Sequence, residues 1–196
     1  TEVAGFMTIL HGDNRIYNNI FVQNWPVTQT EVKQDMGFMM ADNQTVGTGV
    51  FDEYPTYEDW IAHFDLDKPA DMRKLTEYHF AHLPVWIDGN AYFNGAVSWK
   101  KEEHALIDGE HPVRVQLEKR DGGYFLNTNL YEFMGDFRDG VITSDGLGYA
   151  FEPEQRFEDP DGTAISFDRD YAGNHRGPAP LPGPFASADA AGKNLI

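Results

Sequence analysis

The sequence predicts an all-β fold, and two kinds of pattern point to it. Short apolar runs at 3–10 and 16–22 end at turn-forming residues, as strands do. Later, 113–130 alternates apolar and polar residues around Asp121 and Gly122, which is typical of an antiparallel hairpin. The composition, with 41% hydrophobic residues in 196, is that of a folded chain. We therefore expect strands to supply most of the regular structure.

Asparagine recurs inside two of the strand-like stretches, 14–24 and 90–95, where it is interleaved with Ile, Tyr and Phe. Ordinary strands avoid asparagine. At the corners of a parallel β-helix, however, asparagine tolerates the left-handed conformation and stacks its amide on the next coil. Asn-rich turns would give the same pattern, so both interpretations stay open at this point. The β-helix interpretation predicts that 3–22 and 85–94 are adjacent parallel strands.

Between the two Asn-rich stretches lies an insertion of different character. Thr56 and Asp59 have the spacing of a capping box at the start of a short amphipathic helix. Trp60 falls on the apolar face of that helix, so we expect it to pack within the insertion rather than to serve as a sugar platform. Pro69 can open a second helix. The apolar face of the first helix would comprise Tyr57, Trp60, Ile61 and Phe64, and that of the second Met72, Leu75 and His79.

The last third of the chain signals a second hairpin and an extended arm. Asp159 to Gly162 form a turn sequence between 156–157 and 165–167. The proline-rich stretch 177–184 favours extended backbone. The expected order is then coil residues 1–24, a partly helical insertion over 25–82, further coils over 83–110, hairpins and arm over 111–185, and a flexible tail over 186–196.

The net charge limits the classes of partner and substrate that this chain can bind. Fifteen Lys and Arg against 32 Asp and Glu give a formal charge of −17, which repels nucleic acids and anionic membrane surfaces. The same field disfavours a polyanionic substrate and is compatible with neutral sugars. No apolar run approaches the ~20 residues of a membrane-spanning helix. We therefore expect no nucleic-acid partner and no membrane partner.

No cofactor or metal is implied by the sequence. There is no cysteine, which removes thiolate zinc sites and Cys nucleophiles and leaves the compartment open. His79 and His82 lack an evident third ligand, so packing or surface positions explain the histidines better. The acidic run over 159–170 hints at calcium without the rest of an EF-hand loop, and turn chemistry explains it better.

Three pieces of sequence carry a family resemblance: 1–5 with 12–21, 83–86 with 88–92, and 157–162 with 170–171 and 182–185. Together they resemble β-xylosidases of glycoside hydrolase family 120. Each piece is short, but their order and spacing cover almost the whole chain. The resemblance implies a right-handed parallel β-helix, of which this chain would be the C-terminal part, with the remainder of the parent enzyme as its partner. It also implies retaining hydrolysis of β-xylosides or related neutral plant oligosaccharides by two carboxylates.

The resemblance does not place either catalytic carboxylate, and both are expected upstream of Thr1 unless this chain supplies one. Asp13 and Glu2 are the local candidates, because they flank the first strand in the part with the strongest resemblance. A retaining pair needs carboxyl groups roughly 5–5.5 Å apart, one of them with a raised pKa. The alternative is a purely structural role, in which Asp13 caps a turn and forms an ion pair with Arg15.

Substrate contacts are expected from the same turn, which offers an acid, an amide and a guanidinium within a few residues. We expect Gly12 to Arg15 to border a groove that the insertion walls on one side. The competing class of function is a non-catalytic carbohydrate-binding or structural β-solenoid module. The hairpins would allow a homo-oligomer in either case. The candidate substrate-binding residues are His11, Asn14, Arg15 and Trp25.

Overall fold

The computed structural model describes residues 12–23, 45–64, 68–69, 73, 81–120, 122–151 and 153–187. Strands dominate it, as the sequence predicts, and the helices are short. The strands are β1 (Arg15–Tyr17), β2 (Ile20–Val22), β3 (Trp86–Asp88), β4 (Asn90–Phe93), β5 (Ala105–Asp108), β6 (Val115–Arg120) and β7 (Gly123–Thr128). The helices are α1 (Tyr57–Ala62), α3 (Ser144–Leu147) and the 3-10 turns Gly49–Phe51 and Leu130–Phe133.

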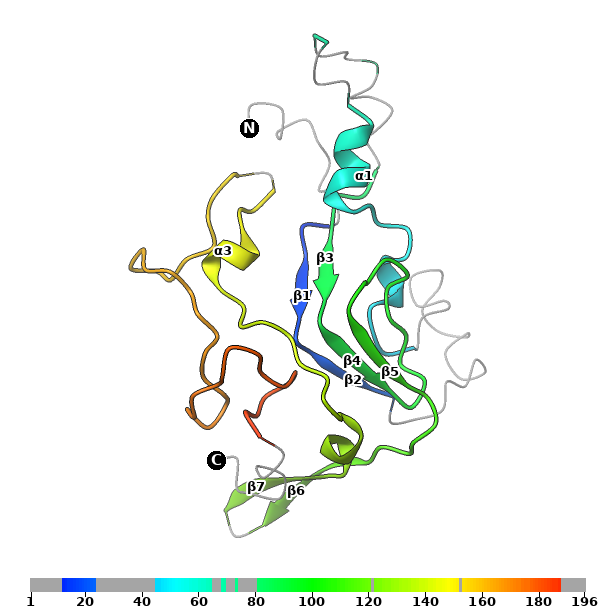
Figure 1. The fold of residues 1–196 in the computed structure, drawn as a ribbon, viewed down its shortest axis with the longest axis vertical. Helices are drawn as coiled ribbons and strands as arrows, with labels where there is room; N and C mark the ends of the chain where they lie inside the picture. Colours follow the sequence, from blue (N-terminus) through cyan, green and yellow to red (C-terminus); the bar gives the residue numbers. More distant parts are fainter. Residues whose placement is uncertain are drawn as a thin grey trace, which may run out of the picture.

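Two stretches far apart in sequence run parallel and side by side. β1 pairs with β3, with Ile16 opposite Ile87, and β2 pairs with β4, with Phe21 opposite Tyr92. β5 then pairs in parallel with the other edge of β4 (Figure 1). The predicted parallel pairing of the two Asn-rich stretches is therefore confirmed over the described residues.

Asparagine lies at the turn between β1 and β2, and the described strands form separate short sheets rather than a closed solenoid. Asn18 lies between β1 and β2 with a φ of 56°, in the left-handed region that asparagine tolerates. Gly89 lies between β3 and β4 with a φ of 70°, and a Cβ there would collide with the carboxylate of Asp139. Beside this corner, Nδ2 of Asn19 donates to Oδ1 of Asn90 at 3.2 Å. This hydrogen bond joins the residue before β2 to the first residue of β4.

A polar network lies inside the coils beneath this corner. One carboxylate oxygen of Glu102 accepts from the backbone and side-chain amides of Asn90, and the other accepts from the Tyr92 hydroxyl. The hydroxyl of Thr48 lies 2.7 Å from that of Tyr92. Burial raises the pKa of Glu102, although hydrogen bonds from Tyr92 and Asn90 act to lower it. Both carboxylate oxygens of Glu102 therefore have hydrogen-bond partners. The network links Glu102 to Asn90 and Tyr92 of β4, and through Tyr92 to Thr48.

Apolar packing continues from the coils into the C-terminal half. Ala91 and Phe93 of β4 are fully buried and form a cluster with Met134 and Leu181. A second cluster contains Val85, Ile87 and Trp99. The arm that ends at Phe185 therefore contributes to the core rather than lying free, and its contact is close: a Cβ on Gly183 would meet the side chain of Ile20.

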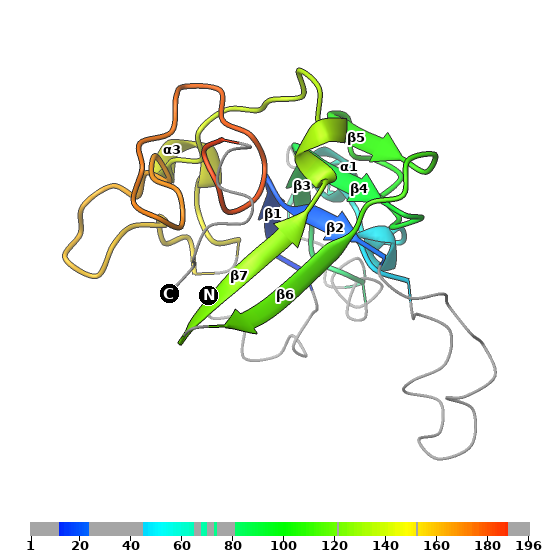
Figure 2. The same ribbon diagram turned by 90° about the horizontal axis from the view of Figure 1, so that it is seen from below.

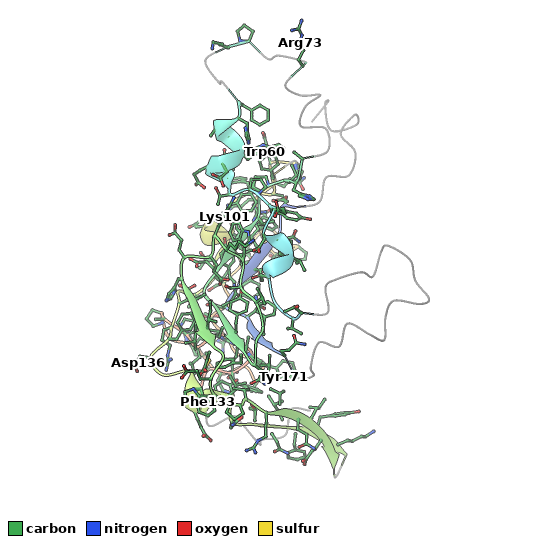
Figure 3. The ribbon with its side chains drawn as sticks, turned by 90° about the vertical axis from the view of Figure 1, so that its right-hand side faces the viewer. Trp60, Arg73, Lys101, Phe133, Asp136 and Tyr171 are labelled. Carbon is green, nitrogen blue, oxygen red and sulfur yellow. The ribbon has the colours of Figure 1, made fainter. Side chains whose placement is uncertain are left out.

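The insertion is described in part, and its first helix is the predicted one. Thr56 and Asp59 form the reciprocal hydrogen bonds of a capping box at the start of α1. Trp60 is 5% exposed and packs against Phe64 within the insertion, which confirms its expected packing role, and also against Phe151 outside it. Figure 3 places Trp60 on α1 with Lys101 nearby, and Lys101 pairs with Asp59 at 2.7 Å. The second helix expected after Pro69 lies outside the described residues.

The two predicted hairpins differ in outcome. β6 and β7 pair antiparallel and extend from the end of the molecule opposite to α1 (Figure 1), as the alternation predicts. The second hairpin is reduced to one bridge between Glu158 and Ala164. Arg156 instead pairs with Tyr149, and Ser166 with Thr143, because the segment folds back on the chain that precedes it. No helix in the described ranges has the length and apolar character that a membrane crossing requires.

Candidate functional site

The turn from Gly12 to Arg15 is built around an ion pair. Asp13 has a φ of 59°, and its backbone amide donates to the carbonyl of Pro84 in the next coil at 2.7 Å. One of its carboxylate oxygens pairs with the guanidinium of Arg15, and the other accepts from the amide of Phe151 at 2.8 Å. The ion pair that a structural role for Asp13 predicts is therefore present, and both carboxylate oxygens of Asp13 have partners.

Arg15 joins the coils to the C-terminal segment. Its side chain is 7% exposed, and the guanidinium lies 3.7 Å from the ring centre of Trp86 and 4.9 Å from that of Phe157. Stacking of a guanidinium on an aromatic face is favourable, more so when desolvated. Arg15 also donates to the carbonyls of Leu147 at 3.3 Å and Tyr149 at 2.7 Å. One side chain thus fixes three separate parts of the chain.

A pocket of about 470 Å³ opens next to this junction. Arg15, Tyr17 and Asn18 of the first coil line one side of it. The other side belongs to the loops over 142–183, which lie alongside β1 (Figure 1 and Figure 2). Its volume falls within the roughly 300–1,000 Å³ of small-ligand sites. The second side contributes Ile142, Leu147, Phe157, Ile165, Phe167, Arg169, Arg176, Pro180 and Gly183.

The lining combines ring faces with hydrogen-bond donors. Phe167 is 58% exposed, so a ligand can reach its ring. Burial raises the pKa of the Tyr17 hydroxyl, as do the charges of Asp88 and Asp139, while Arg15 lowers it. The hydroxyl is therefore protonated at neutral pH and can donate. The described lining includes no carboxylate, so this pocket suits binding rather than acid–base chemistry.

The predicted site residues have different places in this arrangement. Arg15 lines the pocket, whereas Asp13 and Asn14 lie beside it in the same turn. Asn14 is exposed, and its carbonyl accepts from the amide of Trp86 at 2.9 Å. Glu2, His11 and Trp25 lie outside the described residues. The catalytic and substrate-binding roles assigned to these positions remain predictions.

Most of the pocket residues were missed by the sequence analysis. Ile165, Phe167 and Arg169 are spaced two apart and all line the pocket. Alternate residues of an extended segment face the same side, so this spacing was an available signal. Arg169 and Arg176 offered a second signal, because both are positively charged and lie close together in a chain with 32 acidic residues.

The acidic run over 159–170 is engaged within the chain. Asp161 accepts from the backbone amide and the hydroxyl of Thr163, an arrangement that closes a turn. Asp168 lies 3.3 Å from the imidazole of His175. Within the described ranges, no group of three or more His, Asp or Glu side chains is arranged to hold a metal ion.

The overall fold matches that of a solved structure. The match is to a structure described as XylC in complex with xylose, with a TM-score of 0.74 and 22% sequence identity. It covers 94% of this chain and 26% of that chain, so the present chain spans about a quarter of its structural relative. No protein-family model matches the sequence, and no curated protein matches it.

Proposed function

We propose that this chain is the C-terminal part of a right-handed parallel β-helix glycoside hydrolase that cleaves β-xylosides or related plant oligosaccharides. In that enzyme the chain would supply coils of the solenoid and a sugar-binding pocket at the β1–β2 corner. The carboxylates of the retaining mechanism would come from elsewhere in the enzyme.

The observation that carries this proposal is the likeness in fold to XylC, whose structure contains xylose. The parallel pairing of β1 with β3, of β2 with β4, and of β4 with β5 supports a solenoid. The hydrogen bond between the side-chain amides of Asn19 and Asn90 supports it further.

The pocket supports sugar binding on chemical grounds. Pyranose rings present C–H faces that pack on aromatic rings, and hydroxyl groups that need donors and acceptors. Phe167 offers an accessible ring, while Tyr17 and Arg169 offer donors on opposite sides of the same pocket. The three described tryptophans serve other purposes: Trp60 and Trp99 are buried, and Trp86 stacks on Arg15.

The 196-residue chain alone is expected to show negligible turnover of an aryl β-xyloside. Retaining hydrolysis needs two carboxylates at a fixed separation, and Asp13 has both oxygens occupied by Arg15 and Phe151. The measurement is release of the aryl group by the purified chain, compared with a buffer blank. Turnover that Asp13→Asn abolishes would overturn this expectation and make Asp13 a catalytic residue.

Phe167→Ala is expected to weaken the binding of xylose and xylotriose about tenfold, which corresponds to about 1.4 kcal/mol. Loss of a ring face against an apolar ligand surface has an effect of this order. Titration calorimetry or ligand-observed NMR would give the dissociation constants. Tyr171→Ala is the matched control, because Tyr171 is an aromatic residue with 64% exposure that does not line the pocket. Equal affinities for wild type and Phe167→Ala would exclude this pocket as the sugar site.

The absence of a carboxylate from the described pocket lining favours one alternative, a carbohydrate-binding or structural β-solenoid module without chemistry of its own. Such a module would bind xylotriose with the same dependence on Phe167. An assay of the protein encoded by the full reading frame that contains this chain distinguishes the enzyme from the binding module. Hydrolysis by that protein supports the enzyme, and binding without hydrolysis supports the module.

A further inference from the structure

We infer that the pocket at the β1–β2 corner takes a sugar unit that carries a carboxylate, such as a uronic acid substituent on an otherwise neutral oligosaccharide. This inference rests on the proposed sugar-binding function and specifies the ligand of the same pocket. The argument comes from the charges around the pocket.

The residues that line the pocket carry a charge opposite to that of the chain, although Asp88 and Asp139 lie close enough to act on the Tyr17 hydroxyl. The whole sequence carries −17, yet Arg15, Arg169 and Arg176 all line this pocket and none of its other described lining residues is acidic. The ion pair with Asp13 neutralises Arg15. Two positive charges therefore remain for a ligand, those of Arg169 and Arg176.

Arg176 keeps its charge because its partners are neutral. Its guanidinium donates to the carbonyls of Arg169 at 3.2 Å, Leu181 at 3.0 Å and Gly183 at 2.5 Å. Carbonyl oxygens fix the position of a guanidinium without cancelling its charge. Arg176 is thus a pre-positioned cation at the wall of the pocket, where it favours an anionic ligand.

Arg169 is the residue available for direct contact. Both adjacent carboxylates are committed elsewhere, Asp168 to His175 at 3.3 Å and Asp170 to the amides of the following turn and of Ala186. Arg169 is exposed, and one Nη atom donates to the carbonyl of Gly173 at 3.1 Å. Among the described residues, its Nε and its other Nη have no partner. These two groups form the fork that binds a carboxylate through parallel hydrogen bonds.

The geometry of the segment places a ring face next to this fork. Phe167 and Arg169 are two residues apart and line the same pocket. A pyranose ring on Phe167 would therefore direct a carboxylate at its C5 position toward Arg169. The negative field of the rest of the chain disfavours a polyanion, so a single acidic unit on a neutral chain is the ligand that satisfies both charges.

The test compares D-glucuronic acid with D-glucose, which has a neutral CH₂OH in place of the carboxylate, and with D-xylose. We expect the chain to bind glucuronic acid at least tenfold more tightly than glucose at low ionic strength, and 1 M NaCl to remove most of the difference. Arg169→Gln should abolish the preference for glucuronic acid over glucose. Arg138→Gln is the matched control, since Arg138 is an exposed arginine outside the pocket whose side chain donates to backbone carbonyls.

The outcomes separate this inference from the function on which it rests. Equal binding of glucuronic acid and glucose, with xylose bound through Phe167, would overturn the inference and leave the sugar site in place. Binding of none of the three sugars would overturn the sugar site itself. If the preference for glucuronic acid persisted in Arg169→Gln but was lost in Arg138→Gln, the acidic sugar would bind near Arg138 instead, and the inference would be overturned.

Discussion

Replacing Arg15 with alanine is expected to lower the free energy of unfolding by about 3–5 kcal/mol, because removal of one partner leaves a partly buried charge without compensation. The Arg15 side chain is 7% exposed, and that of Asp13 20%. The substitution also removes donors to the carbonyls of Leu147 and Tyr149 and the stacking on Trp86. Urea denaturation followed by circular dichroism measures the loss.

Two companion variants show which part of Arg15 matters. Arg15→Lys keeps the positive charge but cannot reproduce the planar fork, so we expect an intermediate loss of stability. Arg138→Ala, at an exposed arginine, should change the free energy of unfolding by less than about 0.5 kcal/mol. If Arg15→Ala left stability unchanged and weakened sugar binding tenfold, Arg15 would be a ligand contact, as the sequence analysis proposed.

Asp170→Ala is expected to lower the free energy of unfolding by about 3 kcal/mol, because several partly buried hydrogen bonds lose their acceptor at once. Asp170 is 8% exposed. Its carboxylate accepts from the amides of Ala172 at 2.9 Å, Asn174 at 2.8 Å and Ala186 at 3.0 Å, and from the Asn174 side chain at 3.1 Å. Asp168→Ala is the control, since that carboxylate contacts only His175 among the described residues. A loss below 1 kcal/mol in Asp170→Ala would contradict this role.

Asp170 also gives the expected stability a pH dependence of known sign. Burial acts to raise its pKa, but hydrogen bonds from Ala186, Asn174 and Ala172 outweigh burial and hold the pKa below the usual 3.8. A carboxyl group with a lowered pKa in the folded state stabilises the fold above the pKa of the unfolded chain. That stabilisation disappears as the pH falls through the lower, folded value. Denaturation between pH 5 and 2 should therefore show a steeper decline for wild type than for Asp170→Ala.

The sequence was informative where the pattern was local or repeated. The recurrence of asparagine predicted that β1 and β2 lie beside β3 and β4, because the corner conformation of Asn18 and the hydrogen bond between Asn19 and Asn90 depend on residue type. Thr56 and Asp59 predicted the start of α1 for the same reason. The turn chemistry before Ala164 did not define a full hairpin, since the flanking residues found better partners earlier in the chain.

The candidate site was less accessible from sequence because its parts come from distant segments. Arg15 bonds to carbonyls 132 and 134 residues away, and backbone carbonyls carry no sequence signature. The alternative pairing with Asp13 was foreseen because it is local. The pocket wall that faces Arg15 could be recognised only after the loops over 142–183 were placed beside β1.

The parallel register of the coils has a consequence for how the chain acquires its structure. Ile16 pairs with Ile87, and the whole insertion lies between them in the sequence. Tyr92 pairs with Ile107, which follows it closely in the sequence. Closing a longer loop costs more chain entropy, although the cost rises only by about 0.6 kcal/mol for each doubling of length. Pairing of β4 with β5 is therefore favoured to precede the docking of β1 and β2. The insertion can vary in length with little effect on final stability, while the time needed to complete the sheet depends on it.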